Sequence, residues 1–338
     1  MSGSIILGIE SSCDDTSAAI ISGNKILSNV AANQEIHNEY GGVVPELASR
    51  AHQQNIIPVV EKAFSKANIQ QNDICAIGFT RGPGLLGSLL VGTSFAKSLA
   101  MSLGVPLIEV NHLQAHILAH FIDDANPISP TFPFLCLTVS GGHTMLALVK
   151  DYFEMEIIGK TIDDAAGEAF DKIGKIFDLD YPAGPIIDKL AKEGNPDAFQ
   201  FNKPRMENYD YSFSGIKTSV LYFIQKEVRK NPDFIKENLN DLCASVQKSI
   251  IEILMNKLEK ASVDLNIKDV AIAGGVSANS ALRKAMELNQ EKLGWNIFIP
   301  KFEYTTDNAA MIAMVAKLKY ERGEFTDIRT TATAKYDL

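Results

Sequence analysis

The two halves of the chain begin with the same pattern, and this repetition constrains the fold more than any other feature of the sequence. Apolar runs at residues 5–9 and 18–22 flank a polar segment in the first half. Apolar runs at 134–139 and 144–149 flank a glycine-containing turn in the second. Such runs predict strands joined as hairpins. The repetition therefore indicates an internal duplication, with two similar domains and a ligand bound in the cleft between them.

Strands and helices alternate in the rest of the first half. Residues 74–80 and 106–110 are apolar and typical of strands, and residues 86–103 between them form an expected helix. This alternation predicts right-handed crossovers on a largely parallel sheet. A further helix is expected after Pro45. Pro58 is expected to kink or split it, because proline cannot donate the helical hydrogen bond.

A proline-rich connection divides the chain. Residues 123–133 contain two aspartates and three prolines, a composition typical of a link between domains. The expected N-terminal domain comprises residues 1–122 and 308–338, so that the last helix packs back on it. The expected C-terminal domain, residues 130–307, binds the nucleotide and carries a helical insertion. Two domains of ordinary size agree with the length of 338 residues.

The charge of the chain limits its partners. It has 41 Asp and Glu residues against 32 Lys and Arg, a net charge of -9, which argues against non-specific binding to nucleic acid or anionic membranes. No apolar run is expected to span a bilayer, and a cytoplasmic location is predicted. The four cysteines are widely spaced and are expected to be reduced thiols. A nucleophilic role for Cys13 is disfavoured because no histidine lies near it in sequence.

His112 and His116 are four residues apart on an expected helix, residues 111–121. Side chains at this spacing lie on one helical face, where two imidazoles can bind one metal ion. The spacing is equally compatible with two ordinary polar residues on a helix surface. His120 continues the row, either as a third ligand or as an exposed side chain. Leu113 stands where a zinc peptidase has its glutamate base, so peptidase chemistry is disfavoured.

Two glycine-containing turns favour a nucleotide site. Residues 140–144 (SGGHT) lie between two expected strands, and residues 274–279 (GGVSAN) lie between a strand and a helix. Paired glycines let backbone N–H groups approach an anion, and a helix N-terminus favours negative charge. Neither turn is specific alone, but together they indicate a bound nucleotide. The sequence contains neither the P-loop nor the Rossmann pattern.

Acidic residues supply further candidates. Asp164, Glu168 and Asp171 are spaced to share one helical face, where they bind a metal, ribose hydroxyls or a cation, or else form a solvated surface. Asp307 precedes the expected final helix and is therefore an ordinary N-cap candidate. That role does not exclude a second one as a metal ligand.

Taken together and in order, these motifs resemble those of one family. The chain is similar over essentially its whole length to the TsaD family, the tRNA N6-adenosine threonylcarbamoyltransferases. The resemblance implies an α/β fold of two duplicated RNase H-like domains, as in actin, Hsp70 and the sugar kinases. The matching segments are residues 8–16, 111–116, 139–144, 164–172, 212–218, 274–279 and 306–308.

The resemblance also implies an activity and a set of site residues. The family transfers a threonylcarbamoyl group from threonylcarbamoyl-AMP to the N6 amine of the adenosine beside the anticodon, in tRNAs that read ANN codons. By motif position, His112, His116 and Asp307 bind one divalent metal ion per subunit, Fe²⁺ being favoured over Zn²⁺. The residues implied to bind the adenylate, or another adenine nucleotide, are Thr138, Val139, Ser140, Gly141, Gly142, Asp171, Gly184, Asp188 and Asn279. Additional candidates for the site are Glu10, His143, Glu168 and Lys217.

Partners follow from the same resemblance. They are tRNA, which the acidic chain is expected to bind weakly when alone, a TsaB-like paralogue and a TsaE-like ATPase; no membrane is implied. The chain departs from the family pattern at Gln114 and Ala115, which replace Glu-Gly, and at Thr138, where archaeal relatives place a tyrosine ligand.

Two other classes of function stay open at this point. A carbohydrate or acetate kinase of the same fold group would phosphorylate a small acceptor, but it leaves the histidine pair unexplained. A scaffolding paralogue without enzymatic activity would be expected to lack the set His112, His116 and Asp307.

Overall fold

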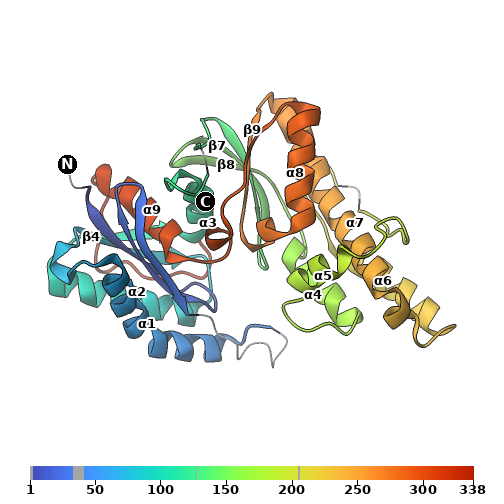
Figure 1. Cartoon of the computed structure of the whole chain (residues 1–338). Helices are drawn as coiled ribbons and strands as arrows, with labels where there is room; N and C mark the ends of the chain where they lie inside the picture. Colours follow the sequence, from blue (N-terminus) through green and yellow to red (C-terminus); the bar gives the residue numbers. More distant parts are fainter. Residues whose placement is uncertain (1–2, 33–41, 127, 205) are drawn as a thin grey trace. The chain divides into compact units, whose positions relative to one another are not determined.

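The structure, a computed structural model, describes residues 3–32, 42–126, 128–204 and 206–338 (Figure 1). The chain forms two compact units. The first unit is Met1–Ser129 with Pro300–Leu338, and the second is Pro130–Ile299.

The boundary near residue 300 differs from the prediction, which placed residues 300–307 in the second domain. Lys301 Nζ lies 2.7 Å from Asp124 Oδ2, and the Tyr304 hydroxyl donates to Asp124 Oδ1 at 2.8 Å. Because Asp124 belongs to the first unit, these bonds hold residues 300–307 there as well. Pro127, part of the predicted connection, lies outside the described residues.

The strands of the first unit form one mixed sheet. Within the described residues they are β1 (Ile5–Glu10), β2 (Thr16–Ser22), β3 (Lys25–Ala32), β4 (Ala76–Gly82) and β5 (Leu107–Asn111). Their order in space is β3-β2-β1-β4-β5. The pairs β1/β2 and β2/β3 are antiparallel, whereas β1/β4 and β4/β5 are parallel. The antiparallel pairing of the first three strands confirms the predicted hairpin, since short turns join antiparallel neighbours. The predicted parallel part of the sheet is β1, β4 and β5.

Helices cover both faces of this sheet. They are α1 (Pro45–Ala67), α2 (Leu86–Leu103), α3 (His112–Leu118) and α9 (Ala309–Glu321), with the 3-10 helices η2 (Gln71–Asp73), η3 (Ala119–Phe121) and η5 (Phe302–Tyr304). Leu7 and Ile9 of β1 share a buried cluster with residues of α1 and α2. Gly8, between them, faces the opposite side, where a Cβ would lie 2.6 Å from Ala309 O and Ala313 N of α9. Figure 1 shows α9 on the side of the strands away from α1 and α2.

α1 is one helix of 23 residues with Pro58 inside it. Of the two predicted effects of Pro58, a kink or a split, the split is therefore wrong. Pro58 is exposed, and water can therefore bond the carbonyl that the proline leaves without a donor. Ile56 and Val59, on either side of Pro58, are buried and hold both parts of the helix against the sheet.

α2 is long and apolar enough, by length and composition, to cross a membrane, and its mean hydropathy is 1.3. The expectation that no apolar run meets this test is therefore wrong. Ala96 and Ala100 pack in the same buried cluster as Leu7 and Ile9. Core packing against the sheet accounts for the buried third of α2, whereas Leu86, Leu90 and Met101 are exposed.

The second unit repeats the sheet of the first. Its strands, within the described residues, are β6 (Phe134–Val139), β7 (Thr144–Asp151), β8 (Glu154–Lys160), β9 (Asp269–Ala273) and β10 (Asn296–Phe298). The order β8-β7-β6-β9-β10 matches β3-β2-β1-β4-β5, with two antiparallel pairings followed by two parallel ones. This shared topology is what the predicted duplication requires. β8 was not predicted, because its largely exposed residues carry no apolar alternation.

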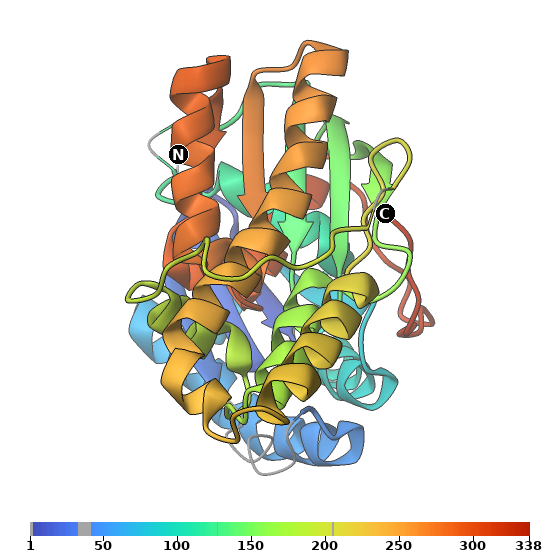
Figure 2. The same cartoon turned by 90° about the vertical axis from the view of Figure 1, so that its right-hand side faces the viewer.

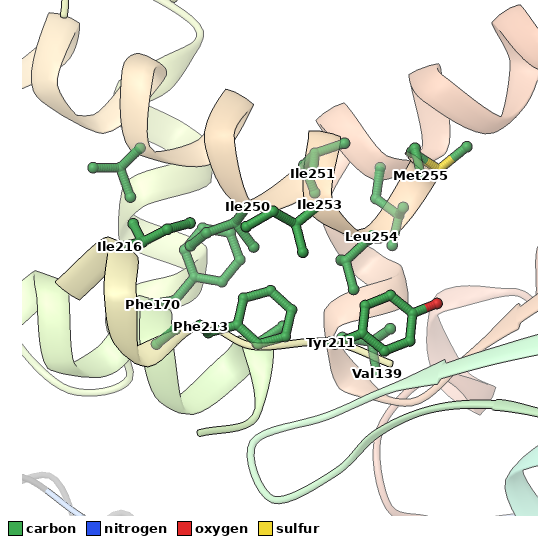
Figure 3. Packing of buried hydrophobic residues seen from close by; sticks show 14 of the residues in the cluster. Val139, Phe170, Tyr211, Phe213, Ile216, Ile250, Ile251, Ile253, Leu254 and Met255 are labelled. Carbon is green, nitrogen blue, oxygen red and sulfur yellow. The ribbon is translucent and has the colours of Figure 1, made fainter. Parts of the chain in front are cut away.

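A long helix organises the core of the second unit. The helices here are α4 (Ala166–Ile176), α5 (Ala183–Ala191), α6 (Ser214–Val228), α7 (Phe234–Leu265) and α8 (Ser280–Leu293), with the 3-10 helix η4 (Gly275–Ala278). α7, light orange in Figure 2, lies across the strands of this unit. Figure 3 shows Phe170 of α4, Phe213 before α6 and Ile250 of α7 in one buried cluster. Segments far apart in the sequence therefore share one core.

Gly8→Ala should destabilise the chain by about 1–3 kcal/mol, because the new methyl group overlaps the backbone of α9. Denaturant unfolding measures the loss. Gly87→Ala is the matched control, since a Cβ there meets only side-chain atoms of Ser49, at 3.3 and 3.4 Å. Equal stability of the Gly8 variant and the wild type would contradict this account of how α9 packs.

Candidate functional site

The edge of the first sheet gathers several polar side chains. β1, β4 and β5 are parallel, so their carboxyl ends lie at the same edge. Glu10 ends β1, Thr80 lies near the end of β4, and β5 ends at Asn111, directly before the helix that carries His112 and His116. The carboxyl edge of parallel strands is where open α/β sheets bind their ligands.

His112, His116 and Asp307 converge at this edge. Asp307 Oδ1 lies 3.1 Å from His116 Nε2 and 3.4 Å from His112 Nε2. The two rings are perpendicular, with centroids 4.8 Å apart, and the candidate ligand atoms of the three residues all lie within 4.8 Å of one another. Both histidines are buried, at 7% and 2% exposure. The alternative of two polar residues on a helix surface is therefore excluded.

Asp307 can face the histidines because it does not cap α9. The N-cap of α9 is Asn308, whose Oδ1 accepts a hydrogen bond from Met311 N at 3.1 Å. The prediction that Asp307 is the N-cap is wrong by one residue. The neighbouring asparagine satisfies the first turn of the helix and leaves the carboxylate of Asp307 available to the imidazoles.

Glu10 fixes the orientation of His112. Glu10 Oε2 lies 3.1 Å from His112 Nδ1 and accepts a hydrogen bond from Thr80 Oγ1 at 2.6 Å. The backbone N–H of Ser12 donates to the other oxygen of Glu10. With Nδ1 bonded to a carboxylate, His112 directs Nε2 toward Asp307, and Nε2 can bind a metal ion once it has lost its proton. A carboxylate behind an imidazole is the usual support of a metal-binding histidine.

The electrostatics of this group favour a cation. Burial would lower the pKa of His112, but the carboxylates of Asp307 and Glu10 raise it to about 10. Burial opposes ionisation of Asp307 and Glu10, yet the charge of His112 holds the pKa of both carboxyls below the ordinary range. The buried carboxylate of Glu10 and the half-buried carboxylate of Asp307 thus depend on positive charge close to them.

His120 and Cys13 do not join this group in the described residues. His120 is buried, and Asn126 Nδ2 lies 2.9 Å from its Nδ1, so it is neither exposed nor part of the convergent set. Burial raises the pKa of the Cys13 thiol, which keeps it protonated and argues against a nucleophilic role.

A second group of predicted residues lies in the second unit, around the turn between β6 and β7. Thr138 and Val139 are fully buried strand residues, and Ser140 Oγ accepts a hydrogen bond from His143 N at 3.0 Å. A Cβ placed on Gly141 or Gly142 would meet no atom within 4 Å. The two glycines therefore leave open space where side chains would otherwise stand.

Two further segments contact this turn. Gly167, in the first turn of α4, donates its N–H to Ser140 O at 3.2 Å. A Cβ on Gly274, before η4, would lie 2.5 Å from Val139 O. The structure thus brings together the two glycine-containing turns that the sequence singled out, 140–144 and 274–279, and adds the start of α4.

Three of the predicted nucleotide-binding side chains already hold this framework together. Asp171 Oδ1 accepts from Ala183 N at 2.8 Å, beside Gly184 in the first turn of α5. Asp188 Oδ1 accepts from the N–H and the hydroxyl of Ser280, and Asn279 caps α8. These bonds join α4, α5 and α8 around the glycine turns.

The acidic residues near α4 are neutralised from within the unit. α4 begins at Ala166, so Asp164 precedes it and does not share a helical face with Glu168 and Asp171 as predicted. Lys172 Nζ lies 2.6 Å from Asp164 Oδ1 and 2.9 Å from Glu168 Oε1. Lys172 therefore supplies a cation that balances these two carboxylates.

Sequence reasoning gave no function to two residues that position the candidate sites. No sequence pattern marked Thr80, because the residue that it bonds, Glu10, lies on another strand and 70 residues away in sequence. Asp163 accepts hydrogen bonds from the hydroxyls of Ser212 and Ser214 and from Phe213 N. It thereby fixes the start of α6, which carries Lys217.

Comparison with known proteins identifies the family. Residues 25–314 match the family described as TsaD, tRNA N6-adenosine threonylcarbamoyltransferase. The chain belongs to the TsaD family. A TsaD relative from Riemerella anatipestifer, named tRNA N6-adenosine threonylcarbamoyltransferase, is 83% identical over all of this chain and 99% of its own length. The family predicted from the sequence motifs is confirmed.

Solved structures support the fold predicted for a TsaD protein. HypF from T. kodakarensis superimposes with a TM-score of 0.60 at 14% identity, over 96% of this chain and 49% of HypF. The ROK hexokinase from Thermus thermophilus superimposes with a TM-score of 0.50 at 14% identity, over 94% of this chain and all of the hexokinase. The duplicated α/β fold of the sugar-kinase group is therefore confirmed.

Glu10→Gln should weaken metal binding by the TsaD chain at least about tenfold. Both carboxylate oxygens of Glu10 accept hydrogen bonds, one from Ser12 N and one from Thr80 Oγ1. A glutamine has only one acceptor oxygen, so its NH₂ group would face one of these donors and lose that bond. Calorimetric titration of the metal-free protein with Zn²⁺ measures the change. Glu46→Gln, at an exposed position on α1, is the control; equal weakening of binding in both variants would contradict the role given to Glu10.

Proposed function

We propose that this chain transfers the threonylcarbamoyl group of threonylcarbamoyl-AMP to the N6 amine of the adenosine next to the anticodon, in tRNAs that read ANN codons. One observation carries the proposal beyond family membership. Two buried imidazoles, His112 and His116, converge with the half-buried carboxylate of Asp307, and Glu10 bonds the other nitrogen of His112. A scaffolding paralogue does not need these three side chains, and a sugar kinase has no role for the two histidines.

The donor set fits a divalent metal ion, with His112, His116 and Asp307 as its ligands. Two histidines and one carboxylate are typical of non-haem iron(II) sites and occur in catalytic zinc sites too. We favour Fe²⁺, with Zn²⁺ as the alternative. When bound, the metal supplies Lewis acidity that stabilises negative charge on a carbonyl or phosphate oxygen.

Residues of the second unit bind the adenylate in this proposal. Thr138, Val139 and Ser140 position the turn. The side-chain positions of Gly141 and Gly142 are open, and in this proposal the backbone N–H groups of the turn donate to the phosphate. The residues that bind the rest of the adenylate are Asp171, Gly184, Asp188 and Asn279. His143, Glu168 and Lys217 stay additional candidates for this site.

The reaction requires the chain mainly to position the adenosine amine against the carbonyl carbon of the donor. The donor is a mixed anhydride, so attack by the N6 amine forms a C–N bond, breaks the bond between the carbonyl carbon and the phosphate oxygen, and releases AMP and a proton. Holding amine and carbonyl in contact removes most of the entropic part of the barrier. Glu10 and Thr80 are positioning residues: Glu10 bonds His112 and orients it, and Thr80 bonds Glu10.

The partners in this proposal are tRNA, a TsaB-like paralogue and a TsaE-like ATPase, and the location is the cytoplasm. The net charge of -9 supports a need for partners in tRNA binding, since the phosphate backbone repels an acidic surface. One local basic stretch of the sequence comprises Lys217, Lys226, Arg229 and Lys230. It is partly neutralised, because Lys230 Nζ lies 2.8 Å from Glu227 Oε1.

The double variant His112→Ala/His116→Ala should lose both the metal and the transferase activity, because only one candidate ligand is left. Elemental analysis of anaerobically purified protein measures the metal. Nucleoside analysis of tRNA, after addition of threonylcarbamoyl-AMP and the two partner proteins, measures the modification. His52→Ala removes a buried histidine elsewhere in the first unit and should leave metal content unchanged.

Modification at the wild-type rate by the double variant would exclude the metal mechanism. Rapid phosphorylation of a sugar by the wild-type chain, in a panel of sugars with ATP and Mg²⁺, would favour the kinase instead.

Gly141→Val should leave stability unchanged and raise the KM for threonylcarbamoyl-AMP about tenfold or more. The free chain has room for the side chain, but that room is where the phosphate approaches in our proposal. Initial rates at varied adenylate concentration measure the change. The control is Gly215→Ala, where a Cβ makes ordinary contact with Pro204 at 3.5 Å. An unchanged KM in the Gly141 variant would contradict binding of the adenylate at this turn.

A further inference from the structure

The last residues of the chain contact the segment that leads into the histidine helix. Thr333 N donates to Arg81 O at 2.9 Å, and Gly84 N donates to Ala334 O at 3.3 Å. The Tyr336 hydroxyl donates to Glu109 Oε1 at 3.1 Å, and the Arg81 guanidinium lies 4.8 Å from the centre of the Tyr336 ring. The C-terminal segment, residues 333–338, is thus fixed along the ends of β4 and β5.

Asn111 connects this C-terminal segment to α3. Its side-chain Nδ2 donates to Asp337 O at 2.8 Å and to Tyr336 O at 3.4 Å. Its Oδ1 accepts from Leu113 N at 2.9 Å and from Gln114 N at 3.1 Å, which makes Asn111 the N-cap of α3. One amide group therefore bonds the C-terminal segment on its nitrogen side and the helix on its oxygen side.

The orientation of this amide matters for the helix. An amide turned by 180° would direct its NH₂ group at the N–H groups of Leu113 and Gln114 and lose both capping bonds. The two carbonyls of the C-terminal segment bond only the NH₂ end, so they select the capping orientation. α3 has seven residues, too few to hold its shape without its cap and its packing, and it begins with His112.

We propose that residues 336–338 form a positioning element of the metal site: the carbonyls of Tyr336 and Asp337 orient the Asn111 amide, which fixes the first turn of α3 and with it His112. This inference rests on the metal-binding part of the proposed function. The residues concerned are positioning residues, since none of them belongs to the convergent set of ligands.

The test compares chains that differ in length and at position 111, with Co²⁺ alone as the probe. Metal-free protein is titrated with Co²⁺, and binding is followed by visible absorption. A chain that ends at Lys335 should bind Co²⁺ about tenfold more weakly than the full chain, as for loss of other groups that support metal ligands. Asp337→Ala keeps the main-chain carbonyl and removes only an exposed side chain, so it should bind Co²⁺ like the wild type.

Asn111→Asp separates orientation from a general loss of structure. A carboxylate accepts hydrogen bonds whichever way it is turned, so it caps α3 without help, but in the full chain it faces the carbonyls of residues 336 and 337. Shortening the chain should therefore weaken Co²⁺ binding when residue 111 is asparagine and strengthen it in the Asn111→Asp background. The added negative charge of the Asn111→Asp variant is present in both the full and the shortened chain. It therefore cannot explain why shortening changes Co²⁺ affinity in opposite directions in the two backgrounds.

Three results decide the matter. If shortening weakens binding equally in both backgrounds, or has no effect on the wild-type sequence, the positioning role is overturned. If the full wild-type chain fails to bind Co²⁺, the metal part of the proposed function fails first. Opposite effects of shortening in the two backgrounds support the proposal.

Discussion

The buried contact between Glu10 and His112 is the interaction on which the rest of the candidate metal site depends. It joins the end of β1 to the start of α3 across 102 residues of sequence. A carboxylate without a partner is unstable in a buried position, so Glu10 needs the imidazole as well as the donors Thr80 and Ser12. In return the carboxylate orients the ring of His112, so that Nε2 faces the side where Asp307 lies.

Close packing of α9 against β1, rather than a polar contact, brings Asp307 to the side of His112 where Nε2 lies. Gly8 has no side chain, so α9 lies directly against the backbone of β1 at Ala309. Asp307 stands two residues earlier and therefore reaches the edge where β1 ends. Asn308 takes over the cap of α9, and the carboxylate of Asp307 is left for the histidines. Backbone packing and capping thus decide the position of a candidate ligand.

The second unit uses the same sheet for a different purpose. Where β1 ends in a carboxylate, the corresponding strand β6 ends in a turn with two glycines that leave open space. Asp171, Asp188 and Asn279 bond the first turns of α5 and α8, so the helices around this turn are held rigidly before any ligand binds. One duplicated fold therefore offers charged ligands in one unit and backbone donors in the other.

The sequence by itself determined the features that depend on neighbouring residues: the paired hairpins, the helix over residues 86–103, the spacing of His112 and His116, and the ordered motifs of the TsaD family. It left metal binding by the two histidines undecided, because spacing says nothing about burial. It also misplaced the cap of α9 and left His120 open, since both questions turn on contacts with other segments. The tertiary structure settled the burial of the two histidines, the cap of α9 and the place of His120. The contacts that decide them, such as that of His116 with Asp307 across 191 residues, arise from packing of the whole unit and have no local pattern.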